Sequence, residues 1–199
     1  MRASRPESAL RREDHYMADN MADNIVIFDL ETQRDLDEVG GREFLNRVGV
    51  SVGVSYALTS HRFHHYLEHE LGDLVAQLRA ADLVVGFNIR AFDYPVLQAY
   101  TEFDLASLPT CDIMDHVRQA LGHRVALDSL AQQTLGVRKS ADGRMALRWW
   151  KDGQINLIRD YCQQDVDVTR RLYEFGRDHG YLWSWDRRTQ QRVKIPVGW

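Results

Sequence analysis

Short runs of apolar residues, separated by polar segments, predict the strands of this chain. Residues 24–30 (NIVIFDL) form a short apolar run rich in β-branched and aromatic side chains, which is typical of a buried strand. A second apolar run at 48–58 and the segment HRFHHYL at 61–67 are joined by two residues, so we expect a β-hairpin there. The run DLVVGFN at 82–88 predicts another buried strand.

Other segments have the spacing of helices with one apolar face. They are residues 70–81, 92–100, 129–135 and 155–175. Strands therefore come first as a meander and later alternate with helices. This order predicts an α/β fold in which a mixed sheet is covered by helices.

The length of 199 residues suits one domain with a real core. Residues 1–23 are polar and lack periodicity, and we expect them to form a flexible leader because they have little apolar surface to bury. The folded domain is predicted at 24–180. The tail at 181–199 is rich in Trp, Arg and Lys, and we expect either a terminal hairpin packed on the domain or a surface for a partner.

Charge and composition exclude some classes of protein. A formal net charge of −4 argues against a protein that holds long duplex DNA by a strongly basic face. No apolar run approaches the roughly 18 residues that a membrane span needs, so no membrane partner is expected. The two cysteines offer neither a disulfide framework nor a CxxC pair for zinc, and we expect a protein of the reducing cytoplasm.

Three acidic residues follow predicted strands. Asp29 and Glu31 are two apart at the end of the first strand, so their carboxylates share a face. Asp93 opens a predicted helix just after the strand at 82–88, beside the expected end of the first strand. Carboxylate oxygens suit Mg²⁺. The alternatives are ordinary surface acids for the first two, and for Asp93 a stabilising interaction with the helix dipole.

Tyr161 and Asp165 are four apart on a predicted helix and therefore lie on one face. Asp165 falls on the apolar stripe of this helix. A buried carboxylate is costly without a positive partner, so Asp165 needs a cation. A metal ion is one candidate, and Arg159 or Arg170 is the alternative.

The motifs DxE, N-x₃-FD and Y-x₃-D occur in this order. Together they resemble the DEDD exonucleases of the ribonuclease H-like superfamily, in the subtype that has tyrosine before the last acid. Asp160 stands where the other subtype has histidine. The stretches GFNIRAFDYPVL and YCQQD are most similar to the proofreading domain of family B DNA polymerases and to YprB-like stand-alone nuclease domains. The resemblance covers residues 24 to about 180.

This resemblance implies a ribonuclease H-like fold with a mixed sheet of about five strands. It further implies hydrolysis of phosphodiester bonds at single-stranded 3′ ends, with DNA slightly favoured over RNA. Tyr161 would orient the attacking water, and two divalent cations, Mg²⁺ or Mn²⁺, would be held by Asp29, Glu31, Asp93 and Asp165.

The same resemblance implies contacts to the substrate. The alternative function is a ribonuclease H-like module that binds nucleic acid or a protein without cleaving, and the sequence identifies no protein partner. The predicted substrate contacts are Leu30, Thr32, Asn88, Phe92 and Lys139.

Some further signals are open to two interpretations. Basic residues at 138–151 accompany Trp149 and Trp150, a combination that suits single-strand binding, although both tryptophans could equally be packing residues. Asp112 and Asp115 are interpreted as acids at the start of a helix. Four histidines at 61–69 do not share a face, which favours a solvated hairpin over a metal site.

Overall fold

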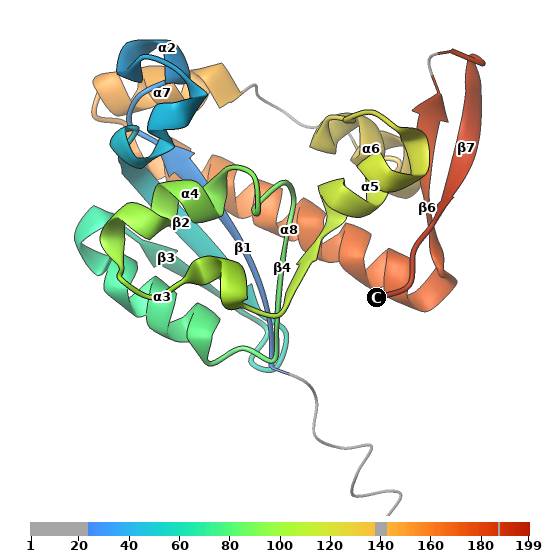
Figure 1. Ribbon diagram of the computed structural model, residues 1–199, viewed down its shortest axis with the longest axis horizontal. Coiled ribbons are helices and arrows are strands. Elements are labelled where there is room, and N and C mark those ends of the chain that lie inside the picture. The colour runs from blue at the N-terminus through green and yellow to red at the C-terminus, as the bar shows by residue number, and fades with distance from the viewer. Residues whose placement is uncertain (1–23, 138–142, 187) are drawn as a thin grey trace, which may run out of the picture.

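The computed structural model describes residues 24–137, 143–186 and 188–199 (Figure 1). The expected leader at 1–23 and the predicted contact Lys139 lie outside these residues. Within them, a mixed five-stranded sheet has the order β3-β2-β1-β4-β5, with β1 parallel to β4 and antiparallel to β2. The predicted fold class is therefore confirmed. The strands are β1 (Ile25–Thr32), β2 (Val50–Ala57), β3 (Arg62–Tyr66), β4 (Leu83–Gly86) and β5 (Thr110–Asp112).

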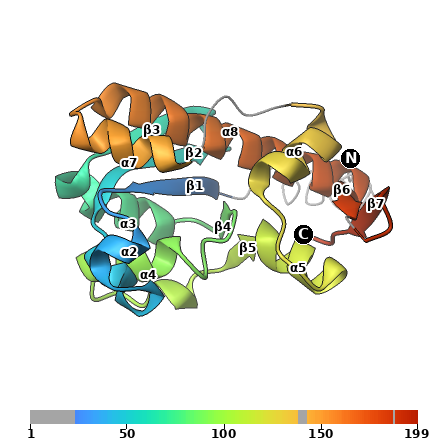
Figure 2. The same ribbon diagram turned by 90° about the horizontal axis from the view of Figure 1, so that it is seen from above.

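Helices cover both faces of this sheet (Figure 2). On one face lie α6 (Leu127–Leu135), α7 (Gly143–Lys151) and the long helix α8 (Ile155–His179). On the other face lie α2 (Leu36–Val39), α3 (Leu71–Arg79) and α4 (Asp93–Leu97). Helix α5 (Ile113–Leu121) follows β5 directly. Short 3₁₀ segments lie at Arg42–Arg47, Glu68–Glu70, Gln98–Tyr100 and Leu105–Ser107.

Strand β1 divides its side chains between two cores, because successive residues of a strand point to opposite faces. Val26, Phe28 and Leu30 belong to the core that includes residues of α3 and α4. Ile25 and Ile27 belong to the core on the side of α8. All five are buried. The central strand is thus fixed from both sides, which makes it a rigid support for the polar side chains at its carboxyl end.

Predicted and observed elements agree in the central sheet and differ around it. The predicted hairpin is β2–β3, with Tyr56 opposite Phe63, and the predicted helix at 155–175 extends to His179. The strand β5 and the helices α2 and α7 were not predicted, and of α5 only the start near Asp112 and Asp115 was expected. Strand β5 has only three residues and α2 only four, so neither presents a full hydrophobic period.

The tail forms a separate two-stranded antiparallel sheet of β6 (Tyr181–Asp186) and β7 (Gln191–Pro196). It packs on α6, where the Thr134 hydroxyl accepts a hydrogen bond from the Trp183 amide and donates one to the Trp183 carbonyl. Beyond β7, the Trp199 indole donates a hydrogen bond to the Tyr173 carbonyl on α8. A side chain at Gly176 would collide with this indole, so the glycine permits the close approach.

Candidate active site

Three carboxylates meet between β1 and α8. Asp29 and Glu31 continue the alternation of Ile25 and Ile27 along β1, so both point to the α8 side of the sheet. Asp165 is 7% exposed and lies on the buried stripe of α8. One oxygen from each of the three side chains lies within 4.8 Å of the others. Three negatively charged groups this close, one of them buried, form a site with the chemistry to hold a divalent cation.

Asp93 approaches the same strand from the α4 side. It is 3% exposed, and its Oδ1 accepts a hydrogen bond from the Leu30 amide at 3.1 Å, between the two acidic positions of β1. Burial raises the pKa of Asp93 well above its usual range, and the neighbouring Asp29 carboxylate raises it further. The fold therefore brings Asp93 to the acidic end of β1, although it is not one of the three residues whose oxygens group within 4.8 Å.

Tyr161 lies one helical turn before Asp165 and is 5% exposed. The ring of Trp149 on α7 meets the Tyr161 ring edge to face, with 6.0 Å between centroids. This contact couples α7 to the predicted catalytic turn of α8. It also places Trp149 against the core, as expected for a packing residue, with Trp150 packed against the same core.

Cys162 contacts the acidic cluster, and the sequence analysis did not single it out. Its thiol lies 3.4 Å from the Asp29 carbonyl oxygen and 3.5 Å from Asp29 Oδ2, as a hydrogen-bond donor to both. Burial raises the pKa of Cys162 well above its ordinary value, with Asp29 and then Glu31 adding to the effect. Its spacing could have identified Cys162 in the sequence, because a residue three positions before Asp165 shares the helical face of Asp165.

The loop between β4 and α4 is held by Asp112. The Asp112 carboxylate accepts hydrogen bonds from the amides of Asn88 at 2.7 Å and Arg90 at 3.0 Å. It also caps α5 by accepting from the Met114 amide, which confirms its interpretation as a helix-start acid. Asn88 has a left-handed backbone, φ 70°, at the turn that leads to Asp93. Asp112 thus fixes the path of the chain to the fourth predicted metal ligand.

The predicted substrate contacts are in different environments. Leu30 is 5% exposed and packs in the α3 and α4 core, and Phe92 is half-buried against the same core. The Thr32 hydroxyl donates to the Arg34 carbonyl. The Asn88 side-chain oxygen accepts a hydrogen bond from Arg124 at 2.5 Å. These four contacts stay predictions, and the burial of Leu30 leaves little of its side chain for a base to touch.

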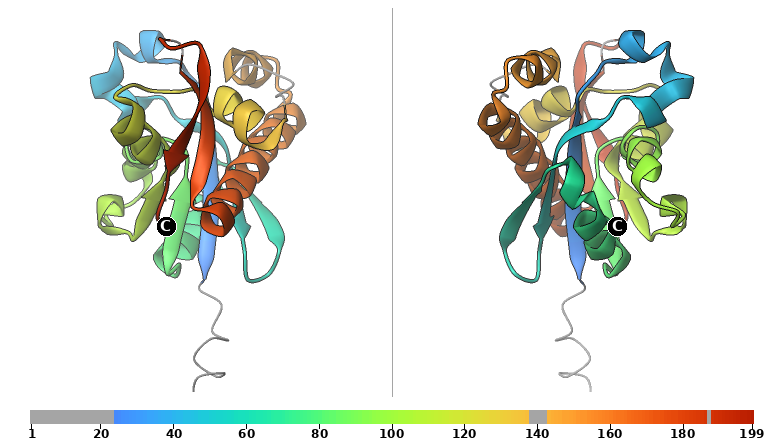
Figure 3. Two further views of the ribbon diagram at one scale, coloured as in Figure 1. Left: turned by 90° about the vertical axis from the view of Figure 1, so that its right-hand side faces the viewer. Right: turned by 90° about the vertical axis from the view of Figure 1, so that its left-hand side faces the viewer.

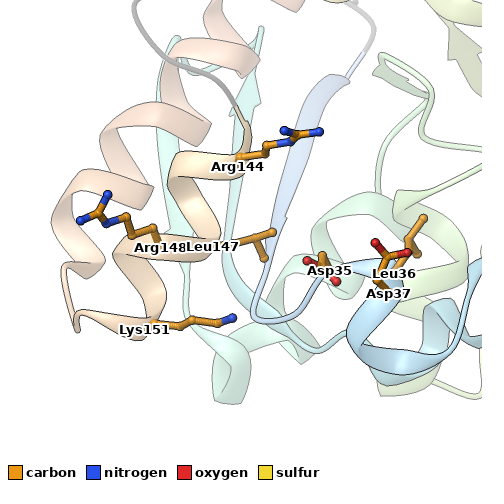
Figure 4. Close-up of a pocket in the computed structure, with 7 residues that line it drawn as sticks. All are labelled: Asp35, Leu36, Asp37, Arg144, Leu147, Arg148 and Lys151. Atoms are coloured by element: carbon orange, nitrogen blue, oxygen red, sulfur yellow. The ribbon is translucent and has the colours of Figure 1, made fainter.

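A groove of about 650 Å³ opens between α2 and α7 beside the carboxyl end of β1 (Figure 4). From α7, Arg144, Leu147 and Lys151 extend toward the groove, whereas Arg148 points away from it. Lys151 Nζ lies 3.2 Å from the Glu38 carboxylate on α2, so an ion pair joins the two walls. The groove therefore has the cations Arg144 and Lys151 on its α7 wall and the acids Asp35 and Asp37 on its opposite wall.

The histidines near β3 do not add to the cluster. Within the described residues, the group of potential metal ligands is Asp29, Glu31 and Asp165. His61, His64 and His65 are exposed, as a solvated hairpin predicts. His65 Nε2 lies 2.7 Å from Gln163 Oε1, which links β3 to the exposed side of α8.

Comparison with known families gives one match. A family model described as the RNase_H superfamily matches residues 26–176, which include most of α8 and all of the five-stranded sheet except Ile25. The chain belongs to the ribonuclease H superfamily. A comparison with curated proteins found no match. The matched residues end before the β6–β7 hairpin, and the acidic cluster lies among them. Across the described ranges, every helix is too short or too polar to cross a membrane.

Proposed function

We propose that this protein is a metal-dependent 3′→5′ exonuclease that removes nucleotides from single-stranded 3′ ends. The observation that carries the proposal is the meeting of the Asp29, Glu31 and Asp165 oxygens within 4.8 Å at the end of the central strand. Membership of a superfamily of nucleases supports hydrolysis of nucleic acid as the reaction class.

The residues present fit two divalent cations, Mg²⁺ or Mn²⁺. Carboxylates are the ligands that such hard cations prefer, and water completes the coordination. Asp29 and Glu31 would hold the ions from β1, and the hydrogen bond from the Leu30 amide brings Asp93 to the same end of the strand. Asp93 and Asp165 would complete the two sites. When bound, the two cations stabilise the attacking and the leaving oxygens of an in-line displacement.

The chain itself has to position water and substrate. Tyr161 is held by the edge of Trp149 and by its place one turn from Asp165, so its hydroxyl is suited to orient the attacking water. The Cys162 thiol donates toward Asp29 and helps to fix the direction of that carboxylate. These contacts restrain the site before substrate arrives, which lowers the ordering cost during the reaction.

The basic wall of the groove supports a single-stranded substrate. Arg144 and Lys151 lie on the groove side of α7, where phosphates upstream of the 3′ end would pass. DNA is proposed ahead of RNA because the sequence motifs are most similar to proofreading domains. No residue of the described site identifies a partner for the 2′-hydroxyl that distinguishes RNA.

The test uses the purified chain with Mg²⁺ or Mn²⁺ and one oligonucleotide labelled at either end. A 5′ label should give a ladder of shortened products, and a 3′ label should appear at once as mononucleotide. Matched DNA and RNA versions of the oligonucleotide test the substrate preference.

The controls use residues of the same region. Asp29→Asn should abolish the ladder, while Asp160→Asn should leave it intact, because Asp160 is exposed and forms an ion pair with its neighbour Arg159. An Asp29→Asn protein that still makes the ladder would refute the proposal. A wild-type protein that binds the oligonucleotide with metal present but never shortens it would instead favour a silent binding module.

A further inference from the structure

The terminal hairpin has two unlike faces. Residues at alternate positions of β6 and β7 that point inward are buried, as Leu182, Ser184 and Ile195 are. The residues at the other positions of the two strands, whose backbone Figure 3 (left) shows, share the opposite face and are half-buried or exposed. We call this outer surface the aromatic-basic face. It consists of Tyr181, Trp183, Trp185, Arg192 and Lys194.

On the aromatic-basic face, cations lie against rings. Arg192 lies 4.2 Å from the centroid of the Trp183 ring. Lys194 Nζ lies 3.9 Å from the Tyr181 centroid and 5.2 Å from that of Trp183. Opposite Arg192, Trp185 is 38% exposed, a large apolar side chain that the fold does not cover.

The rings continue onto the end of α8. Tyr181 meets Trp183 edge to face at 5.6 Å between centroids, and Phe175 meets Tyr181 at 5.8 Å. Phe175 in turn stacks on His179 at 4.0 Å. The face is therefore the end of a continuous row of aromatic rings rather than a set of isolated side chains.

The charge of this region is opposite to that of the rest of the chain. Residues 181–199 contain four cationic residues and one acid, a net charge of +3. Since the whole chain carries −4, the other residues carry −7. A polyanion that is repelled by most of the surface would be attracted here.

A purely structural role explains part of this arrangement. Cross-strand pairs of aromatic and cationic residues stabilise a hairpin, and an isolated two-stranded sheet needs such support. Packing alone does not account for the exposure of Trp185 or for the local excess of cations. The face is also separate from the acidic cluster, because Asp165 and Phe175 are ten residues apart on α8, about 15 Å along its axis.

We propose that the aromatic-basic face binds single-stranded nucleic acid. Phosphates would pair with Arg192 and Lys194, and unpaired bases would stack on Trp185 and the neighbouring rings. A single strand is the ligand because the bases of a duplex are stacked on one another and present only their edges. This binding does not depend on catalysis, so it stands apart from the exonuclease activity.

The test measures binding by the full chain in EDTA, where a metal-dependent nuclease cannot cleave. Fluorescence anisotropy of a labelled oligo(dT) gives the affinity as a function of salt. Lys194→Glu should weaken binding about tenfold at low salt and reduce the slope of log K against log salt by about 0.7, the value for one lost phosphate contact. Arg62→Glu is the matched control on exposed β3, and it should change the affinity less than twofold.

A second variant tests stacking. Trp185→Ala should weaken binding about tenfold and remove most of the quenching of tryptophan fluorescence on binding, whereas Trp185→Tyr should retain most of the affinity. Both variants replace an exposed side chain, so far-ultraviolet circular dichroism and the midpoint of thermal unfolding should confirm an intact fold. If Lys194→Glu disturbs the fold, Lys194→Gln replaces it and should give the same direction of change.

Two outcomes would overturn the inference. One is wild-type affinity in both Lys194→Glu and Trp185→Ala. The other is an equal loss in Arg62→Glu, which would assign the binding to diffuse charge. A protein that shows the predicted pattern in EDTA but never cleaves would refute the exonuclease and leave this surface established.

Discussion

The two faces of β1 share one backbone but differ in the side chains that they present. Toward α3 and α4, Val26, Phe28 and Leu30 are all at most 5% exposed, so this face is apolar along its length. Toward α8, the apolar pattern stops after Ile27 and is replaced by Asp29 and Glu31. The first face stabilises the fold through its buried apolar side chains. The second face has partly buried carboxylates in place of further apolar side chains.

This difference separates the contribution of β1 to stability from its proposed function. Apolar surface removed from water contributes stability at about 25 cal/mol per Å². Clustered carboxylates do the reverse, because like charges repel and burial disfavours them. The stability contributed by the apolar face can therefore offset the charge repulsion on the acidic face. Substitutions on the apolar face should mainly lower stability, and substitutions on the acidic face should mainly lower activity.

The largest expected effect is on the acidic face. Asp29→Asn should lower the exonuclease rate on the order of 10³-fold, since the metal ions contribute several kcal/mol to the transition state. Its free energy of unfolding in EDTA should stay the same or rise, because one charge of the cluster is removed. Rates from product ladders and urea unfolding curves measure the two effects. A marked loss of stability in Asp29→Asn would contradict the view that the acidic positions of β1 do not stabilise the fold.

On the apolar face, Phe28→Ala should lower the free energy of unfolding by about 3–5 kcal/mol, the usual cost of a large cavity. Phe28 is 1% exposed and stacks on Tyr94 with 5.8 Å between centroids. Urea unfolding measures the loss, and Phe28→Leu is the matched variant with a smaller expected cost. At temperatures where Phe28→Ala remains folded, its affinity for Mn²⁺ by calorimetry should be close to that of the wild type.

An intermediate effect is expected for Asp112, which belongs to neither face. Asp112→Ala removes the acceptor for three backbone amides, including those of Asn88 and Arg90. The expected loss of stability is about 2–3 kcal/mol, since a lost cap and partly buried donors left without an acceptor both contribute. The exonuclease rate should also fall, because this loop leads to Asp93. Unaltered activity at full folding would show that the loop does not position Asp93.

The last effect is absent at neutral pH and concerns a thiol in the apolar core. Burial raises the pKa of Cys111 to about 12, from an ordinary value of 9.0. Above pH 9 the unfolded chain therefore loses this proton first, and the stabilisation present below pH 9 is lost as pH rises toward 12. Stability of the wild type should fall faster with pH than that of Cys111→Ala, by up to about 1.4 kcal/mol per pH unit. Parallel curves of stability against pH for the two proteins would contradict the raised pKa of Cys111.

The sequence predicted those parts of the fold in which a local pattern and tertiary packing agree. The strand at 24–30 and the helix from residue 155 are such parts, and β1 and α8 closely match them. The acids were found because they interrupt an apolar pattern, as Asp165 does on the buried face of α8. An acid within an apolar pattern can be recognised in a single sequence without a structure.

Contacts between distant segments were not predictable in this way. Nothing near Cys162 indicates that its thiol would meet Asp29, and nothing near Asp112 indicates that it would bind the amides of the preceding loop. The helix α7 was missed because its polar and aromatic residues fit single-strand binding as well as packing. The contact of Trp149 with Tyr161 exists only in the folded chain.

The assembly of the site from distant segments has a consequence for synthesis in the cell. Cys162 and Asp29 touch across 133 positions of the chain, and Asp165 lies further still. A nascent chain that has emerged only as far as α6 contains Asp29, Glu31 and Asp93 but lacks Tyr161 and Asp165. The proposed hydrolysis therefore requires that α8 has been translated and has docked on the sheet, because only then do all the predicted site residues lie together.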